Sequence, residues 1–177
     1  FSKPLRLFAL FFIKITLCLC AFVTTSIPSF SQTKPDSSFF KPAETFNKKR
    51  FWTLTATGTA LYSGASVGLW NAWYKNNEIT SFHFFDDSGE WNQYDKVGHL
   101  MTAYAETYYS YKAARWVGLP KKKALWTAAG IGTGLQLTIE IMDGFSEKWG
   151  ASVSDVAANA LGAGLAYSQY YFWNEQR

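Results

Sequence analysis

The sequence contains little cysteine and little charge. Only two of its 177 residues are cysteines, Cys18 and Cys20, and both lie in an apolar stretch near the start of the chain. This excludes a disulfide-stapled scaffold, a zinc finger and a CxxC redox pair. Charged residues make up 17% of the chain, against roughly 25% in typical soluble domains. The hydrophobic content of 48% excludes a largely disordered protein.

Aromatic residues, in contrast, are abundant. They make up 19% of the chain, with 8 Trp, 10 Tyr and 15 Phe. Many aromatic and few charged side chains favour a location at a membrane interface, and they predict membrane lipid as a partner. All 13 acidic residues but only 14 of the 17 basic residues follow residue 31, so the remaining chain is nearly balanced in charge. The pI of about 9.0 therefore does not favour nucleic-acid binding, and we expect no nucleic-acid partner.

Residues 1–31 have the pattern of an export signal. Lys3 and Arg6 form a basic start, and an apolar run follows from residue 7 to residue 23. Small residues then stand at the positions that a signal peptidase requires before the cleaved bond. The alternative is a retained anchor, for which this run is short. With a cleaved signal we expect the outer membrane or the periplasmic side of the cell envelope, and otherwise the inner membrane.

The remaining chain divides into an extended arm at 32–50 and one helical domain at 51–177. The arm carries prolines and polar residues, which favour irregular structure. The domain shows four segments with helical patterning, separated by turn signals. We therefore predict an all-α fold, namely an antiparallel four-helix bundle associated with a membrane. The predicted helices are 51–74, 95–117, 124–141 and 152–173.

The first of these segments, 51–74, carries no charged residue and has aromatic residues at both ends. At about 1.5 Å per residue it is long enough to cross a bilayer. A helix on the surface of a soluble bundle usually has a charged face. We therefore predict that 51–74 spans the membrane. The alternative is a helix buried inside a soluble bundle.

Three pairs of polar residues lie near the ends of the predicted helices. Spacings of three or four residues place the members of each pair on one helical face. In an antiparallel bundle the start of the second helix, the end of the third and the start of the fourth meet at one end of the molecule. We therefore expect one polar cluster. The pairs are Asp95 with His99, Glu140 with Asp143, and Asp155 with Asn159.

Three interpretations of this cluster are open. It can be a structural network in which Asp95 and Asp155 cap helices and His99 pairs with a carboxylate. It can bind a divalent metal ion through His99, Glu140 and Asp155, because imidazole and carboxylate groups are suitable ligands. It can also perform acid/base catalysis, with His99 as the proton-transfer group and Asp95 or Asp155 orienting the ring.

A family resemblance rests on the same residues. The ordered combination of Tyr94-Asp95-Lys96-Val97-Gly98-His99, Glu140, Gly150-Ala151-Ser152, Asp155, Asn159 and Gly162 resembles the YfiM-like family of bacterial envelope proteins. That family is described as predicted periplasmic lipoproteins of unknown function. The chain is more distantly similar to the VanZ-like membrane family. The resemblance covers about residues 50–173 and implies an envelope location without a reaction, although this chain lacks a lipobox.

Two functions from different classes follow. We favour a non-catalytic structural or accessory subunit of the cell envelope, which contacts membrane lipid and another envelope protein. The alternative is a membrane-associated enzyme or metal-dependent binder that acts on a lipid-linked or cell-wall substrate at the polar cluster. The sequence leaves open whether the protein is an enzyme.

Overall fold

The computed structural model describes residues 39–87, 89 and 91–177. The predicted signal at 1–31 and the first residues of the arm lie outside this part of the chain. The described residues form an all-helical fold, as predicted, and their only β structure is two isolated bridges. The α-helices are α2 (Lys48–Leu69), α3 (Tyr94–Val117), α4 (Lys121–Gly144) and α5 (Val153–Trp173), with a π-helical turn at Trp70–Tyr74 and a 3₁₀ turn at Trp91–Gln93.

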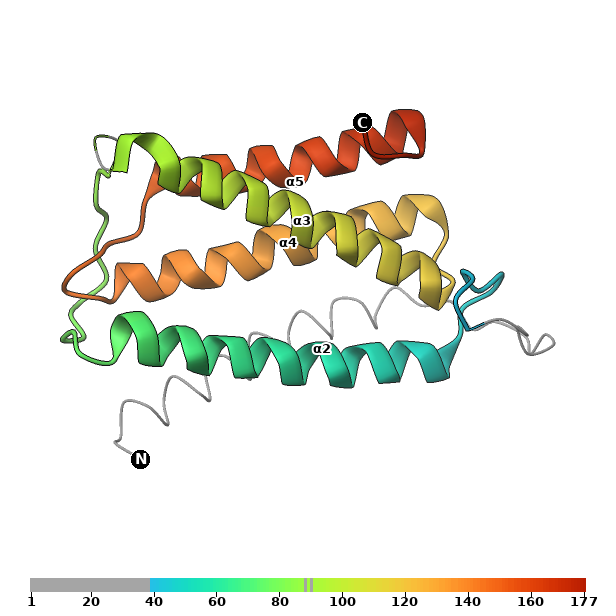
Figure 1. The fold of residues 1–177 in the computed structure, drawn as a ribbon, viewed down its shortest axis with the longest axis horizontal. Helices are drawn as coiled ribbons and strands as arrows, with labels where there is room; N and C mark the ends of the chain where they lie inside the picture. The colour runs from blue at the N-terminus through green and yellow to red at the C-terminus, as the bar shows by residue number, and fades with distance from the viewer. Residues whose placement is uncertain (1–38, 88, 90) are drawn as a thin grey trace.

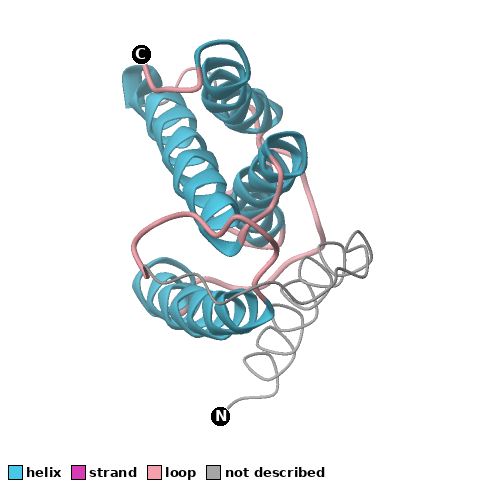
Figure 2. Ribbon diagram, turned by 90° about the vertical axis from the view of Figure 1, so that its right-hand side faces the viewer, coloured by secondary structure: helices cyan, strands magenta, loops and turns pink. Residues whose placement is uncertain are grey.

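Helices α3, α4 and α5 pack tightly against one another, whereas α2 makes few contacts with them. Figure 2 looks along the helices and shows three of them grouped, with α2 set apart. In Figure 1 the chain runs from left to right along α3, back along α4 and again to the right along α5. The start of α3, the end of α4 and the start of α5 therefore lie at the same end of the molecule.

Small residues allow this tight packing. Ala103, Ala128 and Ala163 are almost completely buried. At Gly162 a β-carbon would collide with the carbonyl oxygen of Leu100 on α3, and at Gly132 it would collide with the side chain of Thr107. The two glycines thus set how closely α5 and α4 approach α3. Since Leu100 follows His99, the contact at Gly162 also fixes the depth at which α5 meets the candidate site.

The boundaries of α3 and α4 follow from local sequence. Gly118 ends α3 in the left-handed conformation, with φ of 96°, and its N–H donates to the carbonyl of Arg115. Pro120 then precedes the first residue of α4, so the predicted stop after Val117 is confirmed. The predicted helix at 124–141 is longer in the structure, since the lysines at 121–123 form the first turn of α4 and the helix continues to Gly144.

The predicted membrane-spanning helix at 51–74 is wrong. None of the helices in the described part of the chain is both long and apolar enough to cross a membrane. The segment has no charge, but hydroxyl groups recur along α2, for example at Thr53, Thr57 and Ser66. These groups lower its mean hydropathy, and Thr57 and Ser66 donate hydrogen bonds to carbonyls one turn earlier. The absence of charged residues from 51–74 was therefore not enough to predict a segment apolar enough to cross a membrane.

Side chains rather than close backbone packing attach α2 to the other helices. Phe51 is buried at the start of α2, Tyr62 shares a hydrogen bond with Thr138, and the hydroxyl of Tyr74 donates to Asp143. Between these points, α2 and the faces of α3 and α4 enclose a largely apolar groove of about 290 Å³. The predicted four helices are therefore present, but the compact unit contains three of them.

Candidate functional site

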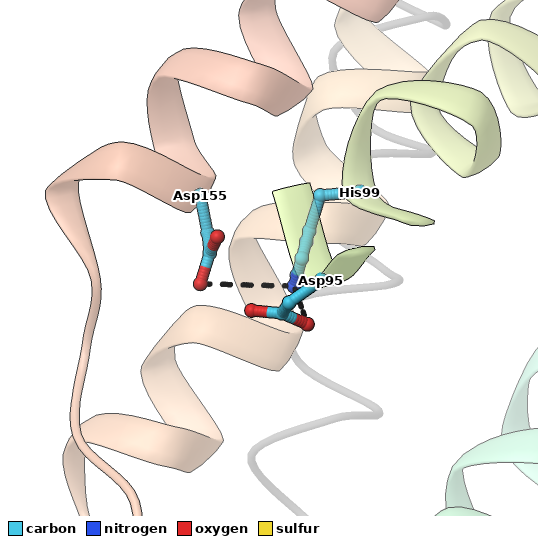
Figure 3. Close-up of side chains that lie close together, drawn as sticks. All are labelled: Asp95, His99 and Asp155. Carbon is cyan, nitrogen blue, oxygen red and sulfur yellow. Dashed lines mark ion pairs between the residues drawn. The ribbon is translucent and has the colours of Figure 1, made fainter. Parts of the chain in front are cut away.

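The side chains of Asp95, His99 and Asp155 meet at the end of the molecule where α3 and α5 begin (Figure 3). Nε2 of His99 lies 3.7 Å from Oδ1 of Asp95 and 3.8 Å from Oδ2 of Asp155. One possible ligand atom from each residue lies within 4.8 Å of the other two. Asp95 is half-exposed and Asp155 is buried, so the group opens to solvent on the side of Asp95.

The other ring nitrogen of His99, Nδ1, faces two further residues of the predicted cluster. Nδ1 lies 3.2 Å from Oδ1 of Asn159 and 3.6 Å from Oε1 of Glu140. Both neighbours are acceptor oxygens, so an N–H at Nδ1 would have suitable partners. Nε2 in turn faces the carboxylate oxygens of Asp95 and Asp155, so acceptor oxygens lie beside both ring nitrogens.

Glu140 is the most unusual carboxyl group of the site. Its side chain is almost completely buried, and Oε2 accepts a hydrogen bond of 3.0 Å from the backbone N–H of Ser152. Oε1 is buried and has no hydrogen-bond partner among the described residues. Burial raises the pKa of Glu140 to about 7, against the opposing effects of the Ser152 N–H and of His99. A buried oxygen of this kind is costly unless a proton or a cation is nearby.

Lys96 is a central residue of the site that the sequence analysis missed. Its Nζ lies 2.6 Å from Oδ2 of Asp87, 2.7 Å from Oδ1 of Asp155 and 3.2 Å from Oδ2 of Asp95. Burial works to lower the pKa of Lys96, but the hydrogen bonds to these carboxylates outweigh it and hold the pKa above its usual value. Lys96 therefore neutralises the oxygens of Asp95 and Asp155 that face away from His99.

Asp87 is the second residue that was missed. Its Oδ1 accepts hydrogen bonds from the hydroxyls of Ser152, at 2.7 Å, and Ser154, at 2.9 Å. Burial works to raise the pKa of Asp87, but the bonds from Lys96 and these serines hold it well below its usual value. Ser152 also caps α5, because its side-chain oxygen accepts from the N–H of Asp155.

The loop that carries Asp87 is paired with the connection between α4 and α5. Phe84 and Ala151 form an isolated bridge, and the N–H of Ala151 donates to the carbonyl of His83. The side chain of His83 adds to this pairing, since its Nε2 donates to the carbonyl of Trp149 at 2.8 Å. This pairing brings a residue of the acidic loop to the start of α5.

A family comparison covers the same region. The model of a family described as predicted periplasmic lipoprotein (DUF2279) matches residues 83–171. The chain belongs to this family. It is accordingly a protein of the cell envelope, on the periplasmic side, with a domain of unknown function. No curated protein and no solved structure matches the chain. The matched range contains the whole candidate site and leaves out α2.

Asp143 and Tyr94 are placed differently from the other residues expected at this end. Asp143 accepts a hydrogen bond of 2.5 Å from the hydroxyl of Tyr74, so it joins α4 to the end of α2 rather than contacting His99. Burial raises the pKa of Asp143 to about 6, against the effect of this hydrogen bond. The side chain of Tyr94, the first residue of the family motif, is 77% exposed.

The arrangement has the donor set of a divalent metal site. It offers one imidazole nitrogen and two carboxylate oxygens, which are typical ligands of Zn²⁺. Bonds of about 2.1 Å in a tetrahedral site separate neighbouring ligand atoms by roughly 3.4 Å. The separations of 3.7 and 3.8 Å at His99 are slightly larger, and all three ligand atoms lie within 4.8 Å of one another.

Proposed function

We propose that this envelope protein binds one divalent metal ion of the zinc class through Asp95, His99 and Asp155, and that its function depends on this ion. The observation that carries the proposal is the orientation of His99. Its Nε2 faces one carboxylate oxygen from α3 and one from α5, while acceptor oxygens surround Nδ1. A histidine that binds a metal usually donates its other N–H to a carboxylate, carbonyl or similar acceptor.

Lys96 supports the proposal because it contacts only those oxygens of Asp95 and Asp155 that do not face His99. It contacts Oδ1 of Asp155 and Oδ2 of Asp95, whereas the oxygens that face Nε2 are Oδ2 and Oδ1, respectively. The ammonium group therefore bridges the two carboxylates through the oxygens that do not face Nε2. In the absence of an ion it also limits repulsion among the acidic side chains.

A site with three protein ligands leaves a coordination position for water or for an anionic group. The half-exposed Asp95 marks the side from which such a group would enter. We therefore favour a metal-dependent binder over a purely structural network, in which His99 would serve only to link α3 and α5. On the chemistry of the site, the group that it binds is a phosphate or carboxylate of an envelope component. The scaffold is the antiparallel bundle predicted from the sequence, working at a membrane surface.

The resemblance noted above fits this proposal. The residues that carry the likeness to the YfiM-like and VanZ-like families include Asp95, His99, Glu140 and Asp155, and Gly162 sets the contact between α3 and α5. The likeness is thus concentrated on the ligands, on their neighbours and on the glycine that positions them.

Calorimetric titration of the metal-stripped protein with Zn²⁺ tests the proposal. We expect one site per chain, and we expect His99→Ala to weaken it by at least a hundredfold. Asn159→Ala should weaken it by about 10- to 100-fold, as is usual for partners of a metal-binding histidine. His83→Ala is the comparison, because it removes a histidine outside the ligand set, and it should weaken binding far less than His99→Ala does. Absence of Zn²⁺ binding by the folded wild type, or equal losses in the two histidine variants, would exclude the site.

A further inference from the structure

The charged residues of the protein are divided between its two ends. The end opposite the candidate site contains the starts of α2 and α4 and the ends of α3 and α5, on the right in Figure 1. Besides the buried Arg50, its basic residues are Lys41, Lys48, Lys49, Lys112, Arg115, Lys121, Lys122, Lys123 and Arg177, and its acidic residues are Glu44 and Glu175. The end that carries the site is mainly acidic, with Lys75, Lys96 and Lys148 as its basic residues.

Large aromatic side chains are exposed among these basic residues. Each of them is more than half exposed, and together they come from the arm and from three helices. They are Phe39, Phe40, Trp52, Trp126, Tyr171 and Phe172. We call this surface, with the basic residues just named, the basic–aromatic end. Exposed apolar groups in such number are unusual on a protein surface unless they contact a partner or a membrane.

We infer that the basic–aromatic end docks on the surface of an anionic phospholipid bilayer. Aromatic rings are favoured at the level of the lipid headgroups, and lysine and arginine are attracted to anionic lipids. An acidic protein would match the charge, but it would leave unexplained the exposed rings spread over four segments of the chain. Peripheral docking also agrees with the finding that none of the described helices is suited to cross a membrane.

The opposite end provides an internal comparison. It also exposes aromatic residues, such as Phe82, Phe84 and Trp73, but these lie among acidic side chains that an anionic surface repels. Docking through the basic–aromatic end therefore defines an orientation. The helix axes then point away from the bilayer surface. The cluster around His99 lies at the end of the molecule that is farther from the bilayer.

Cosedimentation of the full chain with vesicles tests this surface. The probes are vesicles of phosphatidylcholine alone and vesicles that contain phosphatidylglycerol as well. The key variant is Lys122→Gln with Lys123→Gln. The control is Lys75→Gln with Lys148→Gln, which removes the same charge from the acidic end. A second matched pair is Phe172→Ala against Phe84→Ala, because both rings are well exposed but lie at opposite ends.

We expect the wild type to bind the anionic vesicles at least tenfold more strongly than the neutral vesicles. Each lysine near an anionic surface contributes roughly a factor of five, so the Lys122/Lys123 variant should lose about 25-fold in partition coefficient. The Lys75/Lys148 control should lose little. Phe172→Ala should weaken binding several-fold and Phe84→Ala should not. Residues 1–31 also carry basic residues, namely Lys3, Arg6 and Lys14. Binding that depends only on this segment would change little in either double-lysine variant.

Three results would overturn the docking surface. One is equal binding of the wild type to neutral and anionic vesicles. Another is an equal effect of the two double-lysine variants, which would reflect overall charge rather than one end. If the anionic vesicles fail to bind the chain while soluble polyglutamate binds it through Lys122 and Lys123, the partner is an acidic protein and the proposal is wrong.

Discussion

The ammonium of Lys96 lies 2.7 Å from Oδ1 of Asp155, while the other oxygen of that carboxylate faces His99. Both side chains are largely buried. Buried ion pairs of this kind are strongly destabilising when one partner is removed, because the remaining charge has lost its compensation. Lys96 is therefore as important to the site as the histidine that it never contacts directly.

Replacing Lys96 by Met tests this dependence. Lys96→Met should destabilise the fold by about 3–5 kcal/mol at pH 7, since Asp87 and Asp155 would remain buried without their cation. The loss should become smaller as the pH falls and these carboxylates take up protons. Lys75→Met is the control, because Lys75 is exposed, and it should change stability by less than about 0.5 kcal/mol. Urea denaturation at several pH values measures both. Equal stabilities of the two variants would contradict the role of Lys96.

The close approach of α5 to α3 makes a second prediction. Gly162→Ala should destabilise the protein by about 2–4 kcal/mol, because the added methyl group collides with the carbonyl of Leu100 and the two helices must separate. Gly164→Ala, on the same helix, meets nothing within 4 Å and should stabilise it by up to about 1 kcal/mol. Thermal denaturation distinguishes them. If both substitutions changed the stability in the same direction, the contact at Gly162 would not limit how closely α5 approaches α3.

A third prediction concerns Glu106, which lies midway along α3. Burial raises its pKa to about 7, against the hydrogen bond of 2.9 Å that it accepts from Gln136. The folded protein thus holds a proton that the unfolded chain releases near pH 4.5. The contribution of Glu106 to stability should therefore decrease as the pH rises from about 4.5 to 7, and then stay constant.

Glu106→Gln should remove this part of the pH dependence. The variant should be more stable than the wild type above pH 7 by about 1–2 kcal/mol, after allowance for partial exposure, and nearly equal to it below pH 4.5. The stability of the variant should still depend on pH, because burial also raises the pKa of Glu140 and of Asp143. Unfolding curves between pH 4 and pH 8 measure the difference. A stability gap that did not vary with pH would show that Glu106 stays ionised in the folded protein.

Much of the candidate site could be anticipated because helical geometry is local. The spacing of Asp95 and His99 places them on one face, and Ser152 has the residue type and position of a helix cap. The connection after Val117 is short, so the following helix, α4, must run back beside α3. These features can be predicted from neighbouring residues alone. Residues 60 positions apart could therefore be placed at the same end of the bundle.

Lys96 and Asp87 were missed for different reasons. Lys96 follows Asp95 directly, and neighbouring positions on a helix point in different directions, but its long side chain reaches back to the cluster. One signal was present: a group of carboxylates around a single histidine needs more positive charge, and Lys96 is the only basic residue between 76 and 111. Asp87 lies in a loop whose path depends on pairing with residues near 151, which no local pattern reveals.

The loose attachment of α2 has a consequence for the modularity of the protein. Among the described residues, the side chains placed against the His99 ring belong to α3, α4 or α5, and so does Lys96. The turn that follows α2 reaches this end through the contact of Tyr74 with Asp143. The family match likewise begins at residue 83, after α2. We therefore expect that sequence changes along α2 leave the side chains around His99 in place, so that the surface of α2 can vary independently of this cluster.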